Sequence, residues 1–240
     1  SLLFSFLHSA HEAALRDALA AAGKPLFVSA SSDLLPEFRE FERTSTVAVN
    51  AYVGPALERY LARLQNRLKE TGYSGPALIT LSHGGVAPIS EAIRLAAGTV
   101  LSGPAGGLAG ARHASGVLGV GDLIPFDMGG TSTDISLIVD GETTLSSDRV
   151  VAGERIALSS LDIVTLGAGG GSIASVDTGG LLNVGPHSAG ASPGPACYGN
   201  GGVEPTVTDA NVALGFLNPD GFSGGGSALD TKAANTVLDV

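Results

Sequence analysis

The chain has 240 residues, 44% of them hydrophobic and 15% charged, a composition that is typical of a globular protein with a buried core and excludes an intrinsically disordered one. Its formal net charge is −10 at pH 7 and its thirteen Lys and Arg residues are scattered, so nucleic acid is not expected as a partner. The single cysteine, Cys197, and the lack of a signal peptide or a membrane-spanning apolar run favour a cytoplasmic protein with no membrane partner.

The first thirty residues predict a strand, a helix and a second strand. The apolar segment 2–7 reads as a strand already under way, and with no initiator Met this indicates a piece of a longer protein. The alanine-rich segment 11–22 predicts a helix that ends at Gly23. Segment 26–30 predicts a short buried strand, and such an alternation is typical of a parallel α/β layer.

A long helix is predicted from Thr46 to about Glu70, because Leu57, Tyr60, Leu61, Leu64 and Leu68 recur at helical spacing. Pro55 either kinks this helix or marks a new start. The following segments predict a strand at 77–81, a turn at 82–85, a helix at 90–97, a strand at 99–102 and a small-residue helix at 103–113. After Gly116, short β-rich runs replace this alternation. We therefore expect residues 1–73 to be the end of a first α/β lobe with a linking helix, and residues 74–240 to be a second lobe.

The most informative segment, 123–139, predicts a β-hairpin with a polar turn. An apolar strand runs to Asp127, the turn Gly129-Gly130-Thr131-Ser132-Thr133 reverses the chain, and a second strand leaves from Asp134. Asp140-Gly141 then predicts another tight turn. Glycines let backbone amides approach a phosphate closely, and the adjacent hydroxyls can donate further hydrogen bonds. The two carboxylates would repel a phosphate, so they would act through a divalent cation or an oriented water. A plain hairpin with polar turn residues is the alternative interpretation.

This hairpin resembles the second phosphate motif of the actin, hexokinase and heat-shock chaperone superfamily. The resemblance implies that Gly129, Gly130, Thr131, Ser132 and Thr133 hold the β- and γ-phosphates of ATP. It also implies that Asp127 holds the hydration shell of a Mg²⁺ ion or the attacking water, and that Asp134 helps to position the metal or the water.

Further segments, in the same order and at similar spacing, resemble the hydantoinase A/oxoprolinase family along nearly the whole chain. They are 35–46 (LPEFREFERTST), 50–53 (NAYV), 102–107 (SGPAGG), 126–134 (FDMGGTSTD), 167–172 (GAGGGS) and 193–199 (PGPACYG). The resemblance implies an α/β, actin-like (ribonuclease H-like) ATPase fold with a mixed sheet and flanking helices. It also implies ATP-dependent hydrolysis of a cyclic amide such as 5-oxoproline or a hydantoin, and a hydantoinase B-type partner subunit or domain.

The family also includes subunits of ATP-dependent ketone carboxylases, so a carboxylase subunit is an alternative, and a non-catalytic nucleotide-binding scaffold is another. Family members normally carry a first phosphate hairpin and a later adenosine-contacting segment, and neither is visible here. We therefore expect the chain alone to be a poor or inactive ATPase.

Several other segments allow two interpretations each. Ser102–Gly107 would either bind an anion at a helix start or allow close helix packing. Gly167–Ser172 would either line the substrate cleft or form a bulged strand. The charged segment Glu37–Arg43 would either contact another domain or substrate, or form a solvated loop.

Three single residues also have more than one possible role. His83, in a Ser-His-Gly-Gly turn, suits chemistry or a structural role. Cys197 has no assignable His partner for nucleophilic catalysis. Asp209, with Asn211 beside Thr208, reads first as a helix cap and second as a carboxylate of the carbonyl-activation site.

Overall fold

The computed structural model describes residues 1–23, 25–225 and 228–239, and the chain divides into two compact units. The first unit comprises Ser1–Leu123 and Leu137–Asp162, and the second comprises Ile124–Ser136 and Ile163–Val240. The predicted boundary between residues 73 and 74 separates two lobes of a longer protein, and this division stays a prediction. Within the described ranges, no helix is both long and apolar enough to cross a bilayer.

Helices form about half of the first unit. They are α1 (Ala10–Ala21), α2 (Ser31–Leu34), α3 (Glu40–Glu70), α4 (Ile89–Arg94), the 3-10 helix η1 (Ala96–Thr99) and α5 (Ser102–Leu118). The predicted helices at 11–22, 46–70 and 103–113 are confirmed, although α3 begins earlier and runs through Pro55. Leu61 of α3 packs against Leu81, Ala87 and Ala92, which supports the helical face read from the leucine spacing.

The strands of the first unit are short and pair in antiparallel hairpins. They are β1 (Leu78–Thr80), β2 (Val86–Pro88), β5 (Ile138–Val139), β6 (Glu142–Thr143), β7 (Leu145–Ser146), β8 (Arg149–Val151), β9 (Glu154–Ile156) and β10 (Ser160–Leu161). The turn between β5 and β6 contains Asp140 and Gly141, both with positive φ (52° and 77°), which confirms the predicted tight turn.

Three predicted strands are wrong. Residues 2–7 form hydrogen-bonded turns, 26–30 form no regular element, and 99–102 fall at the end of η1 and the start of α5. The parallel layer expected from the first two is therefore not formed, and every strand pair in the described ranges is antiparallel. The reason lies in polar contacts that an apolar pattern does not reveal: the Leu2 amide donates to Glu12, and the Leu2 carbonyl accepts from Arg43.

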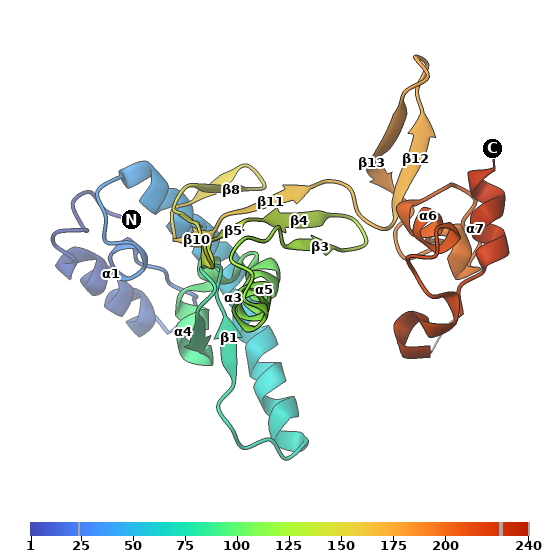
Figure 1. Cartoon of the computed structure of the whole chain (residues 1–240). Helices are drawn as coiled ribbons and strands as arrows, with labels where there is room; N and C mark the ends of the chain where they lie inside the picture. The colour runs from blue at the N-terminus through green and yellow to red at the C-terminus, as the bar shows by residue number, and fades with distance from the viewer. Residues whose placement is uncertain (24, 226–227, 240) are drawn as a thin grey trace. The chain divides into compact units, whose positions relative to one another are not determined.

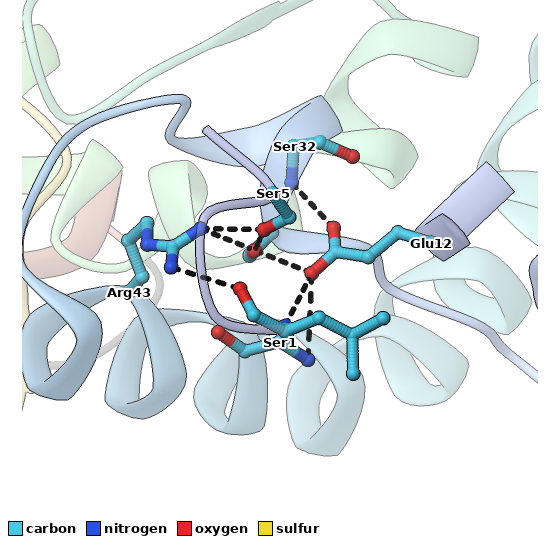
Figure 2. Close-up of polar contacts among 7 residues, drawn as sticks. Ser1, Ser5, Glu12, Ser32 and Arg43 are labelled. Carbon is cyan, nitrogen blue, oxygen red and sulfur yellow. Dashed lines mark hydrogen bonds and ion pairs between the residues drawn. The ribbon is translucent and has the colours of Figure 1, made fainter. Parts of the chain in front are cut away.

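Glu12 and Arg43 are the centre of a buried polar network that joins residues 1–8, α1, α2 and α3 (Figure 2). Arg43 Nη1 donates to the hydroxyls of Ser5 (2.6 Å) and Ser31 (3.0 Å). The Glu12 carboxylate accepts from the Ser31 hydroxyl at 2.7 Å and from the Ser32 amide at 2.8 Å. Arg43 is fully buried in the first turns of α3, so interpreting 37–43 as a solvated loop is wrong for this residue.

The second unit combines a three-stranded sheet, a long hairpin and a small helical core. The sheet has the order β11-β4-β3, and β12 and β13 form the hairpin (Figure 1). Cys197, Val212, Leu229 and Ala234 form the core between α6, α7 and η2. The bounds are β3 (Phe126–Met128), β4 (Thr133–Ser136), β11 (Ile163–Leu166), β12 (Ser172–Val176), β13 (Leu182–Ser188), η2 (Ala196–Tyr198), α6 (Val207–Ala213), η3 (Pro219–Gly225) and α7 (Thr231–Leu238).

Candidate functional site

The predicted hairpin forms as β3 and β4, and its two aspartates are direct cross-strand neighbours. Asp127 pairs with Asp134, and Asp134 pairs on its other side with Thr165 of β11. Directly opposite residues project from the same face of an antiparallel sheet. The Thr165 hydroxyl donates to Asp134 Oδ1 at 2.6 Å, which fixes this carboxylate, whereas Asp127 is exposed. The hairpin therefore presents two carboxylates side by side. The Asp134 carboxylate is fixed by Thr165, and the Asp127 carboxylate is exposed.

The turn between these strands presents unpaired backbone amides. The Gly129 amide donates to the Ser132 carbonyl at 2.8 Å and closes the turn. Over the residues that the structure covers, the amides of Gly130, Thr131 and Ser132 donate to no protein acceptor. Successive free amides at a tight turn form a concave donor set of the kind that binds anions.

A glycine segment, Gly169–Gly171, packs directly against the back of this turn. The Gly170 amide donates to the Gly129 carbonyl at 2.9 Å, and the Gly171 amide donates to the Gly130 carbonyl at 2.7 Å. A Cβ atom at Gly169 would lie 2.6 Å from the Ser132 nitrogen and 2.7 Å from the Thr131 nitrogen. Glycine is therefore required at 169 for the two backbones to approach this closely. Residues 167–171 lie between β11 and β12 and support the hairpin turn, a role that neither interpretation of 167–172 included.

Helix α6 is tied to the same glycine segment. The amide and the hydroxyl of Thr208 both donate to the Gly170 carbonyl at 2.8 Å. Thr206 is the N-cap of α6 and forms a capping box with Asp209, which confirms the helix-cap interpretation of Asp209. Asp209 is fully buried and also accepts from the Cys197 amide at 2.8 Å, so its carboxylate holds η2 and α6 together.

A cavity of about 610 Å³ adjoins the turn within the second unit. It is lined by Gly129, Gly130 and Thr131 of the turn, by Gly170 and Gly171, and by side chains that include Tyr198, Asn211 and Phe222. Asp127, Asp134, Ser132 and Thr133 are not among its lining residues. Thr133 is buried, and its hydroxyl donates to the Ala168 carbonyl at 2.6 Å. The structure thus brings three of the five predicted phosphate-binding residues to the cavity.

The remaining candidates have different surroundings. Burial, followed by the hydrogen bond and negative charge of Asp209, raises the pKa of the Cys197 thiol to about 12, which disfavours the thiolate needed for nucleophilic catalysis. His83 lies exposed in the β1–β2 turn, where its Nδ1 accepts from the Gly85 amide at 3.2 Å. Ser102–Gly107 is the first part of α5, and this segment and His83 belong to the first unit.

The residues present fit a magnesium ion that is held together with a phosphate. Mg²⁺ is usually bound by one or two carboxylates, several waters and substrate phosphates rather than by a complete protein cage. Asp127 and Asp134 supply two neighbouring carboxylates. No group of three or more His, Cys, Asp or Glu side chains in the described part of the chain could hold a metal by itself.

Comparison with known proteins identifies the family. A sequence model of the hydantoinase/oxoprolinase family matches residues 43–240. The chain is 42% identical over 234 residues to the caprolactamase subunit alpha of Pseudomonas jessenii, covering 98% of this chain and 34% of that protein. It is 43% identical over 196 residues to 5-oxoprolinase 1 of Arabidopsis thaliana, covering 81% of this chain and 15% of that protein.

Solved structures agree with the sequence match. The crystal structure of the ATP-dependent caprolactamase from Pseudomonas jessenii superposes with a TM-score of 0.78 at 40% identity, over 99% of this chain and 34% of that one. A nucleotide-free structure of acetone carboxylase superposes with a TM-score of 0.77 at 33% identity, over 100% of this chain and 34% of that one. The chain therefore spans about a third of the length of these relatives. The predicted fold class is confirmed, and the chain belongs to the hydantoinase/oxoprolinase family.

Proposed function

We propose that the chain is the phosphate-binding part of a longer enzyme that uses ATP to activate a carbonyl group, and that this enzyme hydrolyses a cyclic amide. The observation that carries the proposal is the β3–β4 turn: three free amides between two neighbouring aspartates, beside a cavity. Relatives described as an ATP-dependent caprolactamase and a 5-oxoprolinase support the use of ATP and the amide substrate.

The proposed roles follow the chemistry of each group. Gly129, Gly130, Thr131, Ser132 and Thr133 surround the β- and γ-phosphates, with backbone amides as the main donors because the Thr133 hydroxyl is already engaged. Asp127, which is exposed, holds a magnesium-bound water or the attacking water. Asp134, whose carboxylate is fixed by Thr165, helps to position the metal or the water.

The reaction class is phosphorylation of an amide oxygen followed by hydrolysis. The carbonyl oxygen bonds to the γ-phosphorus while the bond from that phosphorus to the bridging oxygen breaks, and ADP leaves with the electron pair. One water then adds to the activated carbon, the ring C–N bond breaks as nitrogen takes up a proton, and a second water releases phosphate. Substrates of the 5-oxoproline, hydantoin or lactam type all contain the required ring amide.

A ketone carboxylase subunit is the second candidate, favoured by the similarity to acetone carboxylase and to the acetophenone carboxylase gamma subunit of Aromatoleum aromaticum. A hydantoinase B-type partner subunit or domain belongs to the proposal, since several relatives are described as subunits. A cytoplasmic location remains a prediction.

ATP turnover by the longer enzyme distinguishes these functions. A cyclic-amide hydrolase hydrolyses ATP only when 5-oxoproline, a hydantoin or a lactam is added, and it releases the ring-opened acid. A carboxylase requires a ketone together with bicarbonate, and a scaffold assembles with ATP without converting any of these compounds. ATP hydrolysis that depends on ketone and bicarbonate alone would contradict the proposed function.

The paired aspartates give the corresponding site test. Asp127→Asn removes one charge with little change in shape, and we expect kcat to fall at least about 100-fold, the scale for losing a group that positions water or stabilises charge. Asp140→Asn is the matched control, because this exposed turn residue has a positive φ that Asn also tolerates. Turnover of Asp127→Asn near the level of the control would remove Asp127 from the mechanism.

A further inference from the structure

A single peptide group connects helix α6 to the β3–β4 turn. In a trans peptide, the C=O of one residue and the N–H of the next point in opposite directions. The peptide between Gly170 and Gly171 is hydrogen-bonded at both of these ends. Its carbonyl accepts from the amide and from the hydroxyl of Thr208, each at 2.8 Å. Its N–H donates to the Gly130 carbonyl at 2.7 Å, so Thr208 and the turn are bonded to opposite sides of one peptide.

The next peptide in this series contains the Thr131 amide. Because the Gly130 carbonyl accepts from Gly171, the Thr131 N–H on the same peptide points away from Gly171. This N–H is one of the three free donors of the turn. A peptide that follows a glycine rotates easily, since glycine has no Cβ to restrict the backbone. The hydrogen bond from Gly171 therefore fixes the direction in which Thr131 offers its proton.

These hydrogen bonds form a chain that runs in one direction. Thr208 donates to the first peptide, the first peptide donates to the second, and the Thr131 N–H is the donor at the end. Hydrogen bonds in such a chain polarise one another, so each donor is strengthened by the bond before it. Thr208 begins the chain with two donors on one carbonyl. The Thr131 amide is thereby both oriented and made a stronger donor.

Thr208 is itself held firmly in place. It is buried in the first turn of α6. Thr206, the N-cap of this helix, is bonded to the Asp209 carboxylate through its hydroxyl at 2.7 Å and through its amide at 3.0 Å. A Cβ atom at Gly170 would lie 2.8 Å from the Thr208 hydroxyl oxygen, so the helix and the glycine segment are already in close contact. The Thr208 hydroxyl is therefore a fixed support for the Gly170–Gly171 peptide.

We propose that Thr208 is a positioning residue for phosphate binding, and that it acts through the Gly170–Gly171 peptide on the Thr131 amide. Its hydroxyl does not bind the phosphate directly, because its proton is donated to the Gly170 carbonyl. This inference rests on the proposed function, since it takes the β3–β4 turn as the site of the β- and γ-phosphates. It adds to that site a side chain of α6 that acts without touching the nucleotide.

Two substitutions at Thr208 separate the hydrogen bond from packing. Thr208→Val keeps the shape and removes the hydroxyl, whereas Thr208→Ser keeps the hydroxyl and removes the methyl group. The measurement is titration calorimetry of the longer enzyme with Mg²⁺ and a non-hydrolysable ATP analogue. We expect the Kd to rise at least about fivefold in Thr208→Val and to stay within about twofold of the wild type in Thr208→Ser.

Thr236→Val is the matched control. The Thr236 hydroxyl also donates to a backbone carbonyl, that of Lys232 at 2.8 Å, but it lies exposed on α7. Removing this hydroxyl should leave the Kd unchanged. If Thr208→Val does not fold, Thr208→Ala takes its place, because it differs from Thr208→Ser by the hydroxyl alone.

A crystal structure of the wild-type enzyme with the same ligand separates positioning from direct binding. We expect a phosphate oxygen within about 3.2 Å of the Thr131 nitrogen, while the Thr208 hydroxyl stays bonded to the Gly170 carbonyl. A phosphate oxygen bonded to the Thr208 hydroxyl itself would overturn the positioning role.

The affinities also distinguish this inference from the proposed function. Wild-type affinity in Thr208→Val, or an equal loss in Thr208→Ser, would overturn the inference. These values are measured without any carbonyl compound. Failure of the proposed function would instead appear in the wild-type enzyme, as ATP hydrolysis that no cyclic amide stimulates.

Discussion

Gly169 shapes the β3–β4 turn although it lies outside that turn. Its Cα approaches the Thr131 and Ser132 nitrogens so closely that no side chain fits between the two backbones. These nitrogens belong to amides that we propose as phosphate donors. The position of a donor matters as much as its presence, because anion binding by backbone amides depends on several N–H groups converging on one point.

Gly169→Ala should therefore displace the turn and weaken MgATP binding. We expect the Kd of MgATP to rise at least about tenfold, equivalent to about 1.4 kcal/mol, because the added methyl must push back the Thr131 and Ser132 amides. Gly167→Ala is the control two residues earlier, where an added Cβ meets nothing within 4 Å and φ is not positive. Equal MgATP affinity in the two variants would show that the close approach of Gly169 to Ser132 does not shape the binding site.

The residues of the site differ in how far the sequence predicts them. The hairpin was predictable because its aspartates, glycines and hydroxyls are contiguous between two apolar strands. Gly169 and Thr208 were not, because their roles come from contacts across the chain: Thr208 and Gly170, for example, are 38 residues apart.

At the scale of elements, the sequence predicts the helices more accurately than the strands. The apolar spacing along 57–68 predicts α3 because Leu57, Leu61 and Leu64 pack in one core cluster of the first unit. Segments 2–7 and 26–30 have the apolar composition of strands, but their polar groups are bonded elsewhere: Ser29 accepts from Asn50 of α3, and Leu2 is held by Glu12 and Arg43. β-propensity describes how well a segment packs against neighbouring strands. These two segments have no neighbouring strand in the described structure.

The Glu12–Arg43 network predicts a pH-dependent stability of the first unit. Burial alone would raise the pKa of Glu12, but hydrogen bonds from the Ser32 amide, the Ser31 hydroxyl and the Leu2 amide lower it from 4.5 to about 2. Because the folded pKa is the lower one, this stabilisation is fully present above about pH 4.5 and is lost as the pH falls toward 2. It corresponds to about 3 kcal/mol at about 1.36 kcal/mol per pKa unit.

Urea unfolding of the first unit, followed by NMR of its amides, measures this effect. Glu12→Gln should lower the free energy of unfolding by about 3 kcal/mol at pH 6, and its difference from the wild type should shrink as the pH approaches 2. Glu58→Gln, on the exposed side of α3, should show no such pH-dependent difference. A constant gap between Glu12→Gln and the wild type at all pH values would contradict the assigned carboxylate role.

At the scale of the whole molecule, we propose that the chain supplies one part of a larger site. It spans about a third of the length of the caprolactamase subunit alpha, and it contains the β3–β4 hairpin that the sequence predicts. The described residues that line the cavity beside that hairpin all belong to the second unit.

A crystal structure of the longer enzyme with Mg²⁺ and a non-hydrolysable ATP analogue tests the central claim most directly. The account predicts the β- and γ-phosphates within hydrogen-bonding distance of the Gly130, Thr131 and Ser132 amides, with the metal or its waters on Asp127 and Asp134. A triphosphate bound away from residues 129–132, with those amides facing solvent, would contradict it.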